Sequence, residues 1–300
     1  MESDGKKEKE KENKKKGGKK SKEDWYKKRE DHWASQEPTL KSVLGGFENS
    51  QLPDVKCSCE LLNGLILTKQ LNPGSCLDCG AGIGRVTEYV LSNFFKEIDL
   101  VEKDKKFIEK CKTKFSGNNK IKNIYLSPLE SFKFEKNYDL IWVQWCLENL
   151  EDEDLEPFLN KCYTHLNDDG LIIVKENLYN LVEEDDDDDE DEEEEEEEDD
   201  DDDDDTEKKD DKEEKKEKKE EKKEKNDKKE EKKEKKEEKK EKKKGEISEF
   251  SYNELDYSKQ RSDAFYINLL TKNKFKIKLH FLNPNWPEEM MPLCVYVLSK

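Results

Sequence analysis

Three glycines stand at alternating positions directly after a short apolar run. The stretch LDCGAGIGR covers residues 77–85 and places glycines at positions 80, 82 and 84. Glycine allows the backbone to approach a ligand at points where any Cβ would intrude. A dinucleotide site favours the spacing G-x-G-x-x-G, with the pyrophosphate at a helix N-terminus. The G-x-G-x-G spacing of this chain therefore suits a ligand without phosphates.

An acidic and a basic side chain stand where such a ligand would need them. Glu102 lies 22 residues beyond Gly80, at the end of a second predicted strand, where a carboxylate can accept hydrogen bonds from two ribose hydroxyls. Arg85 follows the glycine loop, and its guanidinium could pair in bidentate fashion with a methionine carboxylate. Together these residues predict a site for S-adenosylmethionine. The alternatives are an NAD site, or a structural glycine turn with Glu102 and Arg85 facing solvent.

Short strands that alternate with helices position these residues. We predict strands over residues 75–79, 97–101, 121–126, 138–145 and 171–175, and helices over 85–95, 104–115 and 152–166. This alternation is typical of a parallel α/β sheet. A helix over 257–273 precedes two strands, at 275–282 and 293–299, which are joined without a helix and must pair antiparallel. Five parallel strands and a C-terminal antiparallel hairpin predict the Rossmann-like sheet of class I methyltransferases.

The charge of the chain is concentrated in segments that cannot form a core. Of the 300 residues 45% are charged, and residues 183–205 are an unbroken acidic run. Residues 1–21 and 206–244 are rich in Lys and Glu, and they bury too little apolar surface to offset the cost of ordering their backbone. We therefore predict a disordered charged tail (1–21) and one methyltransferase domain (22–181 and 245–300), interrupted by a low-complexity insertion (182–244).

The insertion follows the fifth predicted strand, at the edge of the sheet where ligands bind in open α/β folds. It is either a tolerated loop, because length in a surface loop costs little free energy, or a tail that binds basic partners. Glu/Lys pairs at i,i+4 spacing could also hold residues 206–244 as a single helix. Nucleic acid is not expected as a partner of the acidic run, which would repel phosphate.

The sequence also bears on location and on cysteine chemistry. No apolar run reaches the roughly 18 residues of a membrane span, and the N-terminus lacks the apolar core of a secretory signal. We expect no membrane partner and a cytoplasmic or nuclear location, where thiols stay reduced. The eight cysteines are then expected to be small core side chains. A zinc site formed by Cys57, Cys59, Cys76 and Cys79 is the alternative, although the last two fall on the strand and turn of the glycine loop.

Several stretches resemble the protein α-N-methyltransferases, which modify N-termini that begin X-Pro-Lys or X-Pro-Arg. The matching stretches are HW at 32–33, PTLKSVLGGF at 38–47, LDCGAGIGR at 77–85, YDLIWVQW at 138–145, GLIIVKEN at 170–177 and LDYSKQRS at 255–262. They are spread along both predicted folded segments, and WVQW together with VKEN is more specific than the glycine loop. The resemblance implies a class I fold with an added N-terminal helical segment that closes over the cofactor.

The resemblance implies a set of residues that bind S-adenosylmethionine. The implied contacts come from Gly80, Gly82, Arg85, Glu102, Leu129 and Gln144, with Trp33 covering the cofactor from the N-terminal segment. Glu130 stands where the family has a cofactor-contacting glutamine. Glu102 replaces the more usual aspartate, which keeps the acceptor but lengthens its reach.

The resemblance also implies a substrate site. Leu44, Gly45 and Trp145 match positions around the second-residue proline, Asn177 matches the residue that binds the first peptide carbonyl, and Asp256 and Ser258 match the cluster beside the amine. Asn253 replaces a second acid that assists recognition of the third-residue Lys or Arg. Asn149 stands where many members have a histidine considered a general base. We therefore expect Asp256 to be the proton acceptor, with Asn149 and Asn177 as hydrogen-bonding positioners.

These observations favour methyl transfer to the α-amine of X-Pro-Lys/Arg N-termini of substrate proteins. One alternative is a methyltransferase for another amine, because the absence of N-P-P-Y or D-P-P-Y after the fourth strand argues only against amide or adenine nitrogens. A second alternative is a non-enzymatic protein that binds basic partners, such as histones or ribosomal proteins, through its acidic run. Trp145 and Trp142 are alternatively core aromatic residues.

Overall fold

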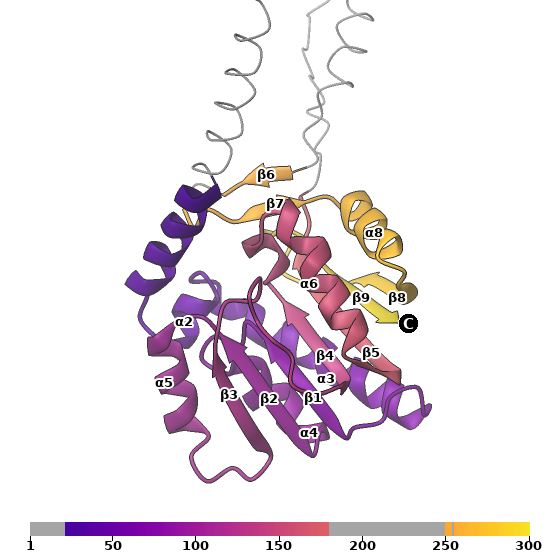
Figure 1. Cartoon of the computed structure of the whole chain (residues 1–300). Coiled ribbons are helices and arrows are strands. Elements are labelled where there is room, and N and C mark those ends of the chain that lie inside the picture. The colour runs from indigo at the N-terminus through magenta and orange to yellow at the C-terminus, as the bar shows by residue number, and fades with distance from the viewer. Residues whose placement is uncertain (1–21, 180–249, 254) are drawn as a thin grey trace, which may run out of the picture. The chain divides into compact units, whose positions relative to one another are not determined.

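The computed structural model describes residues 22–179, 250–253 and 255–300 (Figure 1). The predicted tail (1–21) and insertion (182–244) lie outside the described residues, as does Glu254. Among the described helices, none combines the length and the apolar character that a membrane crossing requires.

A seven-stranded sheet forms the centre of the described part of the chain. Its strands are β1 (Ser75–Cys79), β2 (Glu97–Glu102), β3 (Ile121–Leu126), β4 (Tyr138–Gln144), β5 (Leu166–Asn177), β8 (Lys276–Leu282) and β9 (Leu293–Ser299). They lie in the order β3-β2-β1-β4-β5-β9-β8. The first five pair in parallel, and β9 pairs antiparallel with both β5 and β8. This arrangement confirms the predicted fold class.

The central strands are apolar over most of their length because both faces of the sheet are covered. Figure 1 shows α6 (Asp152–Thr164) and α8 (Asp263–Lys272) on one face and α3 (Gln51–Leu67) on the other. Each face carries its own hydrophobic cluster, one around Phe158 and Tyr266 and one around Leu62 and Trp142. Trp142 is fully buried, which confirms the core alternative for this residue.

The helix ends follow from local capping chemistry. The carboxylate of Asp104 accepts hydrogen bonds from the backbone N–H groups of Lys106 and Phe107, and α5 (Lys105–Lys114) begins there as predicted. Helix α6 opens with three acidic residues, which interact favourably with its N-terminal dipole. The segment predicted as a helix over 85–95 contains a wide π turn (Thr87–Leu91) that continues into α4 (Ser92–Phe94).

The start of the predicted helix over 257–273 is wrong. Residues Lys259–Arg261 form β7, which pairs antiparallel with β6 (Phe250–Tyr252), and α8 begins only at Asp263. The hydroxyl of Ser262 caps α8 by accepting a hydrogen bond from the Phe265 N–H. Residues 259–261 are extended instead of helical because of tertiary contacts. The buried guanidinium of Arg261 donates hydrogen bonds to the carbonyls of Leu147 and Leu150.

Strand β5 begins earlier than predicted. From the sequence we expect the preceding helix to end at residue 166, the polar residues 167–170 to form a turn, and the strand to cover 171–175. In the structure α6 ends at Thr164, and Leu166 already pairs with Tyr138 of β4, with a register shift before Leu171. The polar residues therefore belong to the irregular first part of the strand.

Candidate active site

A cavity of about 490 Å³ opens at the carboxyl ends of β1, β2 and β4, where ligands bind in open α/β folds. Every site residue predicted from the sequence lines it. On the cofactor side these are Trp33, Gly80, Gly82, Arg85, Glu102, Leu129, Glu130 and Gln144; on the substrate side they are Leu44, Gly45, Trp145, Asn149, Asn177, Asn253, Asp256 and Ser258. The volume is in the usual range for a small-molecule site.

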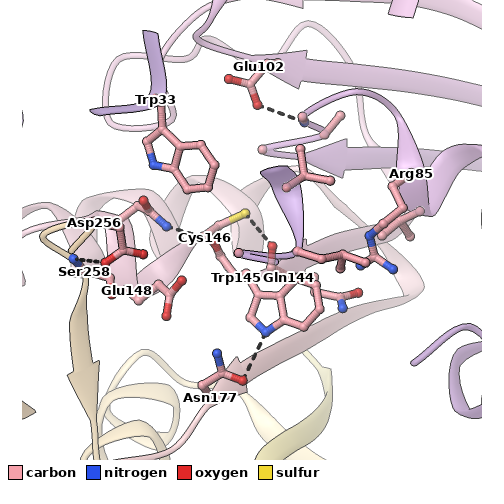
Figure 2. A pocket seen from close by; sticks show the side chains of 18 of the residues that line it. Trp33, Arg85, Glu102, Gln144, Trp145, Cys146, Glu148, Asn177, Asp256 and Ser258 are labelled. Atoms are coloured by element: carbon pink, nitrogen blue, oxygen red, sulfur yellow. Dashed lines mark hydrogen bonds between the residues drawn. The ribbon is translucent and has the colours of Figure 1, made fainter. Parts of the chain in front are cut away.

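The glycine loop is held at the cavity by Glu102. Gly80 and Gly82 have φ angles of 63° and 56°, in the region that favours glycine, and a Cβ on Gly80 would lie 2.5 Å from the Cys146 Sγ. One oxygen of Glu102 accepts a hydrogen bond from the Gly82 N–H at 2.9 Å (Figure 2). The other accepts from the N–H groups of Lys103 and Asp104. Burial raises the pKa of Glu102, and these backbone donors oppose that rise.

Arg85 is part of a buried ionic network under the cavity floor. Its Nη1 donates to the carboxylate of Asp54 at 2.7 Å and to the side chain of Gln51 at 3.0 Å. The guanidinium also lies 4.9 Å from the Trp145 ring. With 5% of its surface exposed, Arg85 is not the solvent-facing residue that the sequence left as an alternative.

Asp54 joins this network to the central sheet. It pairs with Lys175 of β5 and accepts a hydrogen bond from the Gln144 amide at 2.9 Å. Burial alone would raise the pKa of Asp54, but Lys175 and Arg85 outweigh burial and lower it to about 2. The sequence analysis missed Asp54. The available signal was Lys175, a cation in the middle of an apolar strand, which needs a buried anion as partner.

Gln144 ends β4 and Trp145 follows it, and the two side chains have different surroundings. The Gln144 side chain accepts from the Trp142 indole N–H and donates to Asp54, so both ends of its amide are held. Trp145 has a φ of 54°, which is rare for a non-glycine residue and is typical of functional sites. Its ring lines the cavity, and its Nε1 donates to Asn177 Oδ1 at 3.3 Å (Figure 2).

The expected catalytic residues lie around the same part of the cavity. Asp256 Oδ1 accepts a hydrogen bond from the Ser258 N–H at 2.9 Å. The Asn149 side-chain amide donates to the Trp145 carbonyl at 2.8 Å. Asn177 uses its oxygen to accept from Trp145 and therefore keeps its amide N–H groups for another acceptor.

Two further acids, Glu148 and Glu176, lie close to these residues and were not predicted as site residues. Glu176 accepts hydrogen bonds from the N–H groups of Cys146 and Leu147, both at 2.8 Å, and so fixes the turn after β4. Glu148 lines the cavity itself. Burial raises the pKa of both carboxyls; the negative charge of Asp256 adds to the rise at Glu148, and that of Glu148 adds to the rise at Glu176. The sequence did contain a signal for Glu148, because this acid directly precedes Asn149, which was predicted as a site residue.

The four cysteines of the zinc alternative lie on two elements. Cys57 and Cys59 belong to α3, and Cys76 and Cys79 belong to β1. Among the described residues, the His/Cys/acid grouping close enough to hold an ion is Asp263, His280 and Cys294 instead. In that grouping His280 Nε2 and the Tyr296 hydroxyl both bond to Asp263, at 2.9 and 2.5 Å.

The donor set of the cavity fits S-adenosylmethionine. Glu102 offers acceptor oxygens at the end of β2, while Leu129, Val101 and Trp33 provide apolar surface for an adenine ring. Among the described residues, Nε and Nη2 of Arg85 have no hydrogen-bond partner, so the guanidinium can still pair with a carboxylate. The arrangement therefore combines an acceptor for ribose, an apolar slot and a cation.

Comparison with known proteins points to one family. The sequence pattern of a family described as "AdoMet dependent proline di-methyltransferase" matches residues 21–200. An alpha N-terminal protein methyltransferase 1 from Dictyostelium discoideum is 40% identical over 159 residues, which cover 51% of this chain and 59% of that protein. The human N-terminal Xaa-Pro-Lys N-methyltransferase 1 is 34% identical over 158 residues, covering 51% of this chain and 71% of the human protein. The alignments thus omit a substantial part of each relative.

A solved structure supports the same fold. A SAM-dependent methyltransferase from Leishmania major superposes with a TM-score of 0.66 at 23% identity, covering 92% of this chain and 83% of that one. At this identity the likeness concerns the fold alone, and it agrees with the strand order described above.

Proposed function

Because the chain belongs to the family of AdoMet-dependent proline di-methyltransferases, we propose that it transfers methyl groups from S-adenosylmethionine to the α-amine of proteins whose N-terminus reads X-Pro-Lys or X-Pro-Arg. Membership confirms the predicted family and its cofactor. Neither alternative, another amine as substrate or a non-enzymatic binding protein, gains support from the relatives. The observation that carries the proposal is the convergence of both predicted residue sets on one cavity.

The residues predicted to bind the cofactor differ in the part of it that each would contact. When bound, S-adenosylmethionine supplies an electrophilic methyl group on a positively charged sulfur. We assign ribose binding to Glu102, which would exchange its bond from the Gly82 N–H for ligand hydroxyls, and carboxylate binding to Arg85. Trp33, from the helix over residues 22–35, lies on the opposite side of the cavity from Trp145 in Figure 2 and would cover the bound cofactor.

The substrate residues suit a proline in second position. The rigid pyrrolidine ring loses little entropy on binding, and the exposed face of the Trp145 ring, with Leu44 and Gly45 nearby in the cavity wall, offers it an apolar contact. Asn177 has amide N–H groups available for a peptide carbonyl. Asn149 is turned toward the Trp145 carbonyl, so its role is to hold the turn that presents this ring.

Positioning supplies most of the catalysis in this proposal. An α-amine with a pKa of about 7.7–8 is roughly one-tenth neutral near pH 7, so the remaining tasks are removal of one proton and alignment of the lone pair. Asp256, fixed by the Ser258 N–H, provides a negative charge that orients the ammonium group. Asp256 and Asn253 would also face the cation of the third residue.

We also propose that the acidic run helps to bind substrate proteins. Residues 183–205 carry only negative charge and would attract proteins with basic N-terminal tails, which is the chemistry of an X-Pro-Lys/Arg substrate. This segment lies outside the described residues, so the support is its sequence alone. A cytoplasmic or nuclear location remains a prediction.

A peptide panel tests the proposed specificity. Rates are measured on a peptide beginning X-Pro-Lys, on the same peptide with alanine in second position, and on one with glutamate in third position. We expect a loss of about five- to thirtyfold in kcat/KM for each change, since a lost aromatic contact or a reversed charge costs about 1–2 kcal/mol. Equal rates on all three peptides would reject the proposed substrate while leaving the methyltransferase assignment intact.

A further inference from the structure

Glu148 presents a carboxylate to the cavity without a hydrogen-bond donor from the described residues. It lies in the short 3-10 helix Leu147–Asn149 that follows β4, and 8% of its surface is exposed. Figure 2 shows its carboxylate in the cavity beside Asp256 and near the edge of the Trp145 ring. A buried acid with open acceptor positions that face a ligand cavity is unusual, because buried carboxylates are normally hydrogen-bonded.

The charges around Glu148 come from every element packed against it. Asp256 approaches from the turn between β6 and β7, and Glu176 from the end of β5. Arg29 approaches from the helix over residues 22–35, and Arg261 from β7. The Tyr266 ring of α8 completes the surroundings. The two arginines favour the ionised form of Glu148, while burial and the negative charge of Asp256 disfavour it.

This balance makes Glu148 ready to exchange a proton near neutral pH. Burial, followed by the negative charge of Asp256, raises the pKa of Glu148 to about 7, against the opposing effect of Arg29 and Arg261. A peptide α-ammonium has a pKa of about 7.7–8, so the two groups are closely matched and a proton can pass between them at little cost. Glu176 is not equivalent, because one of its oxygens is occupied by two backbone N–H groups.

We propose that Glu148 accepts the proton of the substrate α-ammonium, while Asp256 orients that group. The inference rests on the proposed function. The ammonium N–H bond breaks, and its proton moves to a Glu148 oxygen. The freed nitrogen lone pair then forms the new N–C bond to the methyl group, while the C–S bond breaks and its electron pair stays on sulfur. The product is a charged methylammonium, and Glu148 returns its proton to solvent before the next methyl transfer.

This assignment moves the proton acceptor from Asp256, which the sequence led us to expect, to a residue next to Asn149. Asn149 cannot take a proton, and its amide is bonded to the Trp145 carbonyl. The neighbouring Glu148 places a titratable group one residue away, on the same short helix and in the same cavity. A histidine at position 149 would then provide a second base, with an ordinary pKa of about 6.5, to replace a lost Glu148.

The test is the pH dependence of Glu148→Gln on an X-Pro-Lys peptide. We expect kcat at saturating peptide to fall about six- to elevenfold at pH 7, because only about one-tenth of the amine is neutral there. At pH 9 the amine is almost entirely neutral, so the deficit should shrink to below about threefold. The added change Asn149→His should recover most of the lost kcat at pH 7. A merely structural role for Glu148 would give the same deficit at both pH values.

Controls separate the possible causes of a loss. Glu156→Gln alters a partly exposed acid of α6 that pairs with Lys272, and it should leave kcat unchanged. Calorimetry should show unchanged S-adenosylmethionine affinity for Glu148→Gln, and its Tm should confirm folding. If the wild type is active and Glu148→Gln has the same kcat, this inference alone is overturned. The same holds if the loss of kcat in Glu148→Gln is equal at pH 7 and pH 9. An inactive wild type overturns the proposed function and the inference with it.

Discussion

At the scale of single residues, the turn after β4 converts an apolar strand into a site. The positive φ of Trp145 places its ring in the cavity, while Trp142, three residues earlier, is fully buried in the core. Strain of this kind costs about 1–3 kcal/mol and persists only where the surroundings hold it. Here the Trp145 N–H donates to the Lys175 carbonyl, the Asn149 amide bonds its carbonyl, and Asn177 bonds its ring nitrogen.

Asp256→Asn tests the division of work between the two carboxylates. We expect turnover on an X-Pro-Lys peptide to fall at least tenfold, because the charge that orients the ammonium is lost. The charge of Asp256 is also one cause of the raised pKa of Glu148, so the acid limb of the kcat profile should move to lower pH. Stopped assays from about pH 6 to 9 measure both effects. Unchanged turnover, or an acid limb that moves to higher pH, would contradict the assignment.

Many of the residues predicted for the site stand at strand ends, where the glycine loop and WVQW mark the chain locally, and all of them line one cavity. Glu148 and Asp54 were missed for a different reason. The importance of Asp54 depends on Lys175, 121 positions away, and that of Glu148 on Arg29 and Asp256, which come from distant segments. No local pattern records such pairings, since they exist only after the sheet has formed.

At the scale of elements, α3 is bound to the sheet through the buried carboxylate of Asp54. The ion pairs to Arg85 and Lys175 and the bond from Gln144 connect this helix to the start of the helical segment after β1, to β5 and to β4. Of these groups, Arg85 and Gln144 line the cavity, whereas Asp54 and Lys175 are not among its lining residues. The helix therefore positions two predicted cofactor residues without itself contacting the reacting groups.

Asp54→Asn should destabilise the fold and reduce its sensitivity to acid. Removing one partner of a buried pair typically costs about 3–5 kcal/mol. The pKa of Asp54 falls from 3.8 to about 2 on folding, so its contribution of roughly 2 kcal/mol is complete above about pH 4 and is lost as the pH falls toward 2. Urea unfolding of the wild type and of Asp54→Asn at pH 7 and pH 3 measures the free energy of unfolding of each. If the wild type and Asp54→Asn lost equal stability between pH 7 and pH 3, Asp54 would not be the source of the acid sensitivity.

The wrong helix start at residue 257 shows the limit of reading elements from pattern alone. Residues 259–261 have no strong strand signature, and their extended form depends on pairing with β6 and on the buried Arg261. The true start of α8 does have a local signal, because Ser262 caps the helix with its own side chain. Local capping chemistry can be read from a sequence, whereas a strand held by a distant partner cannot.

At the scale of the whole molecule, the charged insertion separates the last elements of the sheet from the first five strands. Leu178, just before it, and Arg261, after it, form a β-bridge, so the two parts of the domain meet directly. The cavity-lining residues named above all belong to the described ranges. Because the described residues already supply both predicted residue sets, we expect catalysis on a short peptide not to depend on the insertion.

Replacing residues 183–244 with a Gly/Ser linker of about 15 residues tests this separation. We expect the rate on a short X-Pro-Lys peptide to stay within about twofold, because shortening a loop changes the folding free energy little. Affinity for a full-length basic substrate protein should fall, and the remaining affinity should depend less on salt. A matched variant that replaces only residues 206–244 keeps the acidic run and should retain that affinity. Collapse of peptide methylation would show that the insertion shapes the site.

The most direct test of the account is mass spectrometry of an X-Pro-Lys peptide incubated with the protein and S-adenosylmethionine. We predict successive mass increases of one methyl group each, about 14 Da, located by fragmentation on the α-nitrogen, and no increase for the same peptide with an acetylated N-terminus. Absence of any increase, or methyl groups on the lysine side chain instead of the α-amine, would contradict the proposed function.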